Sequence, residues 1–120
     1  AVKSIYDILD WIRENSVSET DKGTKFERLM KAYFKTNPVY KAKFSEVWMW
    51  SEWAEKWQQN QPDYGIDLVA KHRDDDGFTA IQCKCYAETT TVDKDEIDSF
   101  FTESGKKPFT ERIIVATSNQ

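Results

Sequence analysis

The chain has 120 residues, of which 39% are hydrophobic and 32% charged, and its net charge is −4 at pH 7. This length and balance suit one folded domain with its own core and exclude a disordered chain. No apolar stretch is long enough for a transmembrane helix, and the N-terminus lacks the pattern of a signal peptide. The acidic charge argues mildly against binding nucleic acid by bulk charge alone.

Two helices are predicted at the start of the chain. Over residues 4–14, apolar side chains recur at helical spacing behind a capping-box pair of Ser4 and Asp7. A second apolar stripe, over residues 24–36, stops before Pro38 because the residue ahead of a proline disfavours the helical conformation. Basic residues gather in and around this second helix: Lys22, Lys25, Lys31, Lys35, Lys41 and Lys43.

Strands dominate the rest of the chain. A loop is expected at 54–64, and a helix capped by Asp93 and Glu96 is expected to run to about residue 104. The apolar run at 113–116 predicts a strand buried on both faces, which would need a further covering helix. The other predicted strands are 44–50, 65–71 and 78–86, the last two joined by a turn at Asp76-Gly77. The expected class is α/β, in the order α-α-β-β-β-α-β.

The hairpin of the second and third predicted strands contains the candidate catalytic residues. If it is symmetric about its turn, Asp67 lies opposite Gln82 and shares a face with Lys84. The other face is expected to hold the core residues Ile66, Leu68, Ile81 and Cys83. The polar set suits Mg²⁺-dependent hydrolysis of a phosphodiester, because Mg²⁺ prefers oxygen ligands and activates water while a lysine stabilises developing charge. The competing interpretation is a buried polar network or an edge-strand pattern.

This site is one carboxylate short, and Glu27 on the second helix is the best candidate to supply it. A structural interpretation competes, because Thr24 and Glu27 are themselves spaced as a capping box.

Four blocks over about residues 23–118 resemble the Mrr-like branch of the PD-(D/E)xK nuclease superfamily: "GTKFERLMKAYF", "DYGIDLVA", "IQCKCY" and "RIIVATS". The segment "VWMWSEW" also resembles the N-terminal nuclease domain of type ISP restriction–modification or helicase-type proteins. The resemblance implies a restriction-endonuclease-like fold, a mixed central sheet flanked by helices. It implies Mg²⁺-dependent cleavage of double-stranded DNA, with Mn²⁺ able to substitute. The implied catalytic residues are Glu27, Asp67, Gln82 and Lys84, of which Glu27, Asp67 and Gln82 would hold the metal.

The same resemblance sets the expected organisation. We expect a single domain over 1–120, with an N-terminal helix and linker at 1–22 and the nuclease core at 23–118, at the front of a longer protein. A helicase-like motor, which would use ATP, and a methyltransferase domain would lie elsewhere in that protein. Two other functions stay open: an inactive module of the same fold that binds DNA or a protein, and a structure-specific nuclease acting on branched DNA.

Several other polar residues are expected to be structural. Asp63 lies in the predicted loop, residues 74–76 form a solvated hairpin tip, and His72 flanks that tip. Phosphate contact is the alternative for Lys71, His72, Arg73, Lys106 and Lys107, and a general-base role is a further alternative for His72. The tryptophans at 48, 50, 53 and 57 are expected to pack in the core or against another domain, with base stacking as the alternative. Cys83 and Cys85 are expected to be buried free thiols of a cytoplasmic protein.

Overall fold

The structure is a computed structural model that describes residues 5–57, 65–85, 98, 100–102, 104–106 and 108–117. Its elements are, in chain order, α1 (Ile5–Asn15), α2 (Glu19–Thr36), α3 (Pro38–Lys43), β1 (Phe44–Met49), α4 (Trp50–Lys56), β2 (Leu68–His72), β3 (Phe78–Cys85) and β4 (Phe109–Thr117). Residues 98, 100–102 and 104 are also helical. No helix among these described residues is long and apolar enough to cross a membrane.

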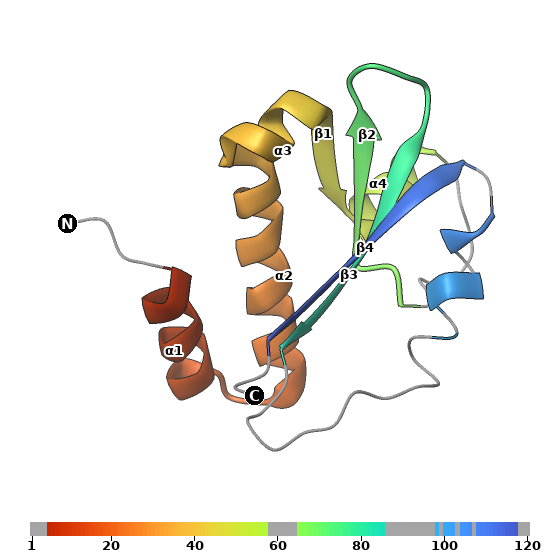
Figure 1. The fold of residues 1–120 in the computed structure, drawn as a ribbon. Coiled ribbons are helices and arrows are strands. Elements are labelled where there is room, and N and C mark those ends of the chain that lie inside the picture. The colour runs from red at the N-terminus through yellow and green to blue at the C-terminus, as the bar shows by residue number, and fades with distance from the viewer. Residues whose placement is uncertain are drawn as a thin grey trace.

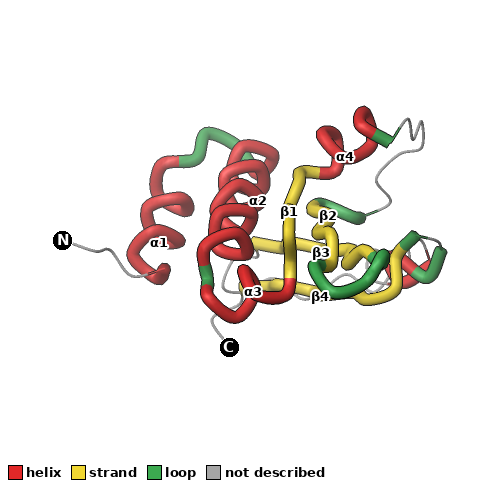
Figure 2. The backbone as a smooth tube through the Cα atoms, turned by 90° about the horizontal axis from the view of Figure 1, so that it is seen from above, coloured by secondary structure: helices red, strands yellow, loops and turns green. Residues whose placement is uncertain are grey.

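The four strands form one mixed sheet in the order β1-β2-β3-β4, in which β3 and β4 run parallel and the other neighbours antiparallel. Helices cover both sides of it (Figures 1 and 2). The side called here the α2 face packs the buried stripe of α2 against Leu68, Ala70, Ile81 and Cys83. The opposite side, the tryptophan face, packs Trp53 of α4 and Phe100 against Val69 and Ala80. The predicted mixed sheet flanked by helices is confirmed.

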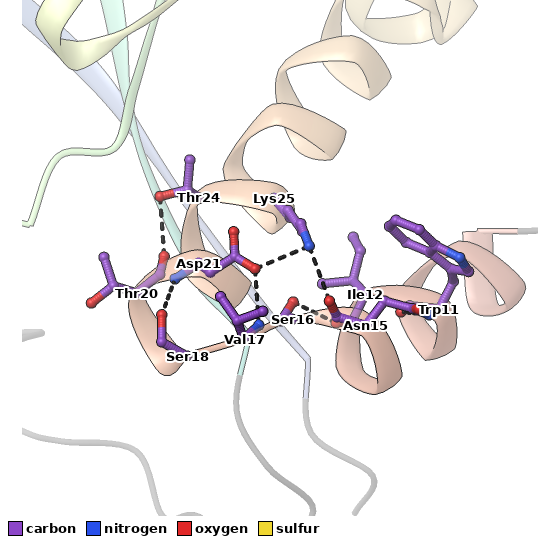
Figure 3. A network of polar contacts seen from close by, with 10 residues as sticks. All are labelled: Trp11, Ile12, Asn15, Ser16, Val17, Ser18, Thr20, Asp21, Thr24 and Lys25. Carbon is purple, nitrogen blue, oxygen red and sulfur yellow. Dashed lines mark hydrogen bonds and ion pairs between the residues drawn. The ribbon is translucent and has the colours of Figure 1, made fainter.

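Helix α2 begins earlier than its sequence pattern predicted. Ser18 is its N-cap, and its hydroxyl accepts a hydrogen bond from the Asp21 amide at 3.0 Å (Figure 3). Thr24 lies one turn inside the helix and donates its hydroxyl to the Thr20 carbonyl at 3.0 Å. The capping interpretation of Glu27 is therefore wrong, because Ser18 and Asp21 already form the helix start. The expected boundary between residues 22 and 23 also falls inside α2.

Two short helices were not predicted. In α3, Asn37 is the cap and accepts from the Val39 amide at 3.0 Å, with Pro38 in the first turn. Helix α4 begins where the first strand was expected to continue, and residues 54–56, expected in a loop, belong to it. The spacing of Trp50, Trp53 and Trp57 is helical and was the signal for α4.

The last strand differs from the expected buried strand. As the final strand in the sheet order, β4 packs Ile113 and Val115 against the α2 face, whereas Ile114 on its other side is 39% exposed. The apolar run of β4 is thus partly buried on one face and exposed on the other. The start of the helix expected at 93 lies outside the described residues, but its end near residue 104 is helical.

Candidate active site

Asp67 lies immediately before β2, and its backbone is fixed from two sides. Its amide donates to the Ile81 carbonyl of β3 at 2.8 Å, and its carbonyl accepts from the Trp50 amide of α4 at 3.0 Å. Its carboxylate oxygen Oδ2 accepts from the Cys83 amide at 2.7 Å. Because strand amides point within the plane of the sheet, the carboxylate occupies the space where β2 would otherwise have continued along β3.

The predicted register of the hairpin is confirmed from Leu68 opposite Ile81 to Lys71 opposite Phe78. The pattern breaks just before β2, because the Asp67 amide bonds to Ile81 and not to the residue that simple symmetry pairs with it. Ile66 then packs on the tryptophan face, so its expected place beside Leu68 on the α2 face is wrong. Gly65 has a positive φ of 88° two residues earlier, a conformation that glycine adopts without strain and that lets the chain make this change.

Glu27 reaches Asp67 from α2. The two side chains share a hydrogen bond, and the pKa of Asp67 is raised to about 8, mainly by burial of its carboxyl and further by the bond to and the charge of Glu27. The Cys83 amide and the positive charge of Lys84 oppose this rise. The same two acidic groups add to burial in raising the pKa of the Cys83 thiol. The two carboxyl groups are therefore close enough to share a proton.

A small pocket opens at this pair of carboxyl groups. Its volume is about 150 Å³, and its lining consists of Glu27, Met49, Trp50, Ser51, Ile66 and Asp67. Met49, Trp50 and Ser51 come from the end of β1 and the first turn of α4. Sequence reasoning missed these three residues because it placed Met49 and Trp50 in a strand and assigned Ser51 to no element.

Gln82 and Lys84 lie on the sheet face opposite Glu27. Ile81 and Cys83 pack on the α2 face, so the alternation of side chains along β3 directs Gln82 and Lys84 to the tryptophan face. The charge of Lys84 still acts on the Asp67 carboxyl. Gln82 is fully buried, and neither its Oε1 nor its Nε2 has a hydrogen-bond partner among the residues that the structure describes. The structure therefore brings Glu27, Asp67 and the charge of Lys84 together, and holds Gln82 on the far side of Asp67.

The donor set fits a hard divalent cation. No group of three His, Cys, Asp or Glu gathers among the described residues, so a metal here would rest on two carboxylates and other oxygen donors. Asp67 and Glu27 are the two carboxylates. Within the described part of the chain, the buried amide oxygen of Gln82 has no hydrogen-bond partner, and a buried oxygen of this kind is costly unless something binds it.

The hairpin tip is structural, as predicted. His72 is buried and is held by two contacts, from Nδ1 to Asp75 at 2.8 Å and from Nε2 to the Thr79 hydroxyl at 2.6 Å. Asp75 also accepts from the Gly77 amide at 2.6 Å, which is the main cause of the lowered pKa of Asp75. The Arg73 guanidinium donates hydrogen bonds to the backbone carbonyls of Lys41 and Phe44. Asp63 and Lys107 lie outside the described residues.

The tryptophans and the first cysteine are also accounted for by packing. Trp53 and Trp48 are buried in the cluster of the tryptophan face, so neither offers a surface for base stacking. Trp50 is half-buried and lines the candidate pocket. Cys83 is a buried free thiol, as expected.

A mixed sheet between helices, with an acidic pair at the point where two central strands separate, defines the class of restriction-endonuclease-like domains. A family model described as "Restriction endonuclease", of the Mrr catalytic type, matches residues 35–120, and the chain belongs to this family. The match spans Asp67, Gln82 and Lys84 but begins after Glu27.

One solved structure is similar over almost the whole chain. It is the "ATP-dependent Type ISP restriction-modification enzyme LlaBIII bound to DNA", which is 34% identical with a TM-score of 0.65. The similarity covers 98% of this chain but 7% of LlaBIII. No match was found among curated proteins.

Proposed function

We propose that this chain is the Mg²⁺-dependent endonuclease domain of a restriction–modification protein, in which Glu27, Asp67, Gln82 and Lys84 form the catalytic site. The observation that carries the proposal is the contact between the carboxyl groups of Asp67 and Glu27 at the edge of a pocket. Partial burial and the neighbouring Glu27 raise the pKa of Asp67, and a bound divalent cation would offset the cost of ionising it. Membership of a restriction endonuclease family supports the same conclusion.

Each residue has a separate role in this proposal. Asp67 and Glu27 would hold the cation with their carboxylates, and Gln82 would add its amide oxygen. A bound Mg²⁺ supplies an activated water and withdraws charge from a phosphoryl oxygen, and Mn²⁺ would substitute for it. Lys84 would stabilise the charge that develops on the phosphate. The Cys83 amide keeps the Asp67 carboxylate in place through its 2.7 Å hydrogen bond.

The substrate we propose is double-stranded DNA. The similar LlaBIII structure is of a restriction–modification enzyme bound to DNA, and this chain matches 7% of it. We therefore propose that ATP use and target recognition belong to helicase-like and methyltransferase domains of the same protein, acting in the cytoplasm. The net charge of −4 fits a domain whose other DNA contacts come from such partners.

Plasmid cleavage in the presence of Mg²⁺ tests the proposal. Asp67→Ala and Lys84→Ala should each reduce cleavage by about a hundredfold or more, because each removes a group that acts in the transition state. Asp76→Ala is the matched control, since Asp76 is an exposed carboxylate of the hairpin tip. All three variants should give the circular dichroism spectrum of the wild type. Full cleavage by Asp67→Ala, in a preparation free of other nucleases, would sink the assignment.

A second candidate is a module of the same fold that binds DNA or a protein without cutting. One observation favours it: Gln82 lies on the sheet face opposite Glu27, so the complete set does not converge from one side. Tight DNA binding without cleavage at any concentration of Mg²⁺ or Mn²⁺ would select this candidate. Cleavage restricted to branched DNA would instead select a structure-specific nuclease.

A further inference from the structure

A short ion pair joins α2 to α4 beside the candidate pocket. Lys31 Nζ lies 2.7 Å from Glu52 Oε1, and the same oxygen accepts from the Met49 amide at 2.9 Å. Glu52 thus caps the first turn of α4 through the Met49 amide and links that turn to α2 through Lys31. The pKa of Glu52 is lowered, first by its hydrogen bond with Lys31 and then by that with Met49, so both contacts favour its charged form.

This ion pair joins the two helices that contribute residues to the pocket lining. Lys31 follows Glu27 by four residues in α2, so the two side chains lie on one side of the helix. Met49 and Trp50, at the end held by Glu52, line the pocket opposite Glu27. The Trp50 amide in turn donates to the Asp67 carbonyl at 3.0 Å. Lys31 is therefore linked through Glu52 to the Met49 amide, and the next residue in the chain, Trp50, is hydrogen-bonded to the backbone of Asp67.

We infer that Lys31 and Glu52 are positioning residues that hold the two carboxylates of the proposed metal site, Glu27 and Asp67, at the separation that a divalent cation requires. The inference rests on the proposed function. Outer contacts of this kind orient metal ligands without touching the metal.

An alternative interpretation is an ordinary surface ion pair. Lys31 and Glu52 side chains are 25% and 48% exposed, and exposed pairs contribute little to stability. The chain contains a matched pair for comparison, Lys43 and Glu111, whose Nζ–Oε2 distance is 2.5 Å and which joins α3 to β4. Neither of these control residues lines the candidate pocket.

The test is the affinity for Mn²⁺ of the wild-type protein and of Lys31→Met, Lys31→Arg and Lys43→Met. Lys31→Met keeps the apolar stem and leaves Glu52 to close α4, but it removes the link to α2. Positioning predicts that Mn²⁺ binds Lys31→Met more weakly by about threefold to tenfold. Charge alone predicts the opposite sign, because removing a nearby positive charge favours a cation. Lys31→Arg should recover wild-type affinity, and Lys43→Met should match the wild type.

The outcomes separate the two proposals. Unchanged or tighter Mn²⁺ binding by Lys31→Met, in a wild type that binds Mn²⁺, would overturn the positioning role and leave the proposed nuclease standing. Equal weakening in Lys31→Met and Lys43→Met would also overturn it, because the effect would then be general. A wild type that binds no Mn²⁺ would overturn the positioning role and the proposed metal site together.

Discussion

At the scale of single residues, Asp67 is the central residue of the proposed site. Its side chain is half-buried beside the carboxyl group of Glu27. It also accepts a hydrogen bond from the Cys83 amide, and the positive charge of Lys84 favours its ionised form. These opposing influences make its proton easy to exchange for a cation, since burial favours the neutral form while a bound metal favours the carboxylate. A carboxylate exposed to solvent lacks these neighbouring groups, so its affinity for a metal would be lower.

The raised pKa predicts how the stability of the metal-free protein depends on pH. The pKa of Asp67 is about 8 in the folded protein against an ordinary 3.8, so between these values the folded protein holds a proton that the unfolded chain has released. Stability should therefore fall as pH rises through this window, by at most about 1.4 kcal/mol per pH unit for one group, and level off above it. Asp67→Asn should lack this component.

Urea unfolding in EDTA, between about pH 5 and pH 9, measures this dependence. The wild-type free energy of unfolding should decline relative to that of Asp67→Asn over the range. Parallel curves for the two proteins would show that Asp67 does not titrate in the folded state as described.

At the scale of elements, the β2–β3 hairpin is the rigid support of the site. His72 fixes its tip by joining Asp75 to Thr79, and its ring stacks on Phe44 of β1 at a centroid distance of 6.1 Å. These contacts hold β1, β2 and β3 together at the end of the hairpin away from the acidic pair. We therefore expect His72 to contribute to stability and not to catalysis.

His72→Ala should therefore lower stability without lowering the activity of folded protein. The loss should be about 2 kcal/mol, because the buried Thr79 hydroxyl loses its partner and the ring leaves a gap. Urea unfolding measures the loss, and cleavage per folded molecule measures activity. Asp74→Ala, on the exposed tip, is the control and should change neither. Abolished cleavage in a folded His72→Ala protein would return His72 to the list of general-base candidates.

Sequence patterns predicted the hairpin well because its register depends on local alternation and a turn signal, both visible in the chain. They failed at the point where the Asp67 amide departs from that register, since this change depends on Gly65 and on the docking of α4. The start of α2 was missed because Thr24 and Glu27 imitate a capping box inside a helix that Ser18 already begins. Local patterns of this kind do not distinguish a helix start from a helix interior.

At the scale of the whole molecule, the fold was predictable because the order of helices and strands is read from periodicity and matches one family. The meeting of Glu27 and Asp67 could be expected from the resemblance but not from spacing, since the two residues are 40 positions apart in the chain and only packing brings them together. The separation of Gln82 from Glu27 by the sheet was not foreseen, because the expected symmetry gave Asp67 the same face as Gln82. A cation would therefore bind at the edge between the two faces.

The central claim is that Asp67 and Glu27 bind a divalent cation, and calorimetric titration with Mn²⁺ tests it most directly. We would titrate the wild type and Asp67→Asn near pH 7, in two buffers of different ionisation enthalpy. Because the carboxyl of Asp67 is largely protonated there, wild-type binding should release a proton and its heat should depend on the buffer. Asp67→Asn should bind far more weakly. A wild type that binds no Mn²⁺, or an Asp67→Asn protein that binds equally well, would contradict the account.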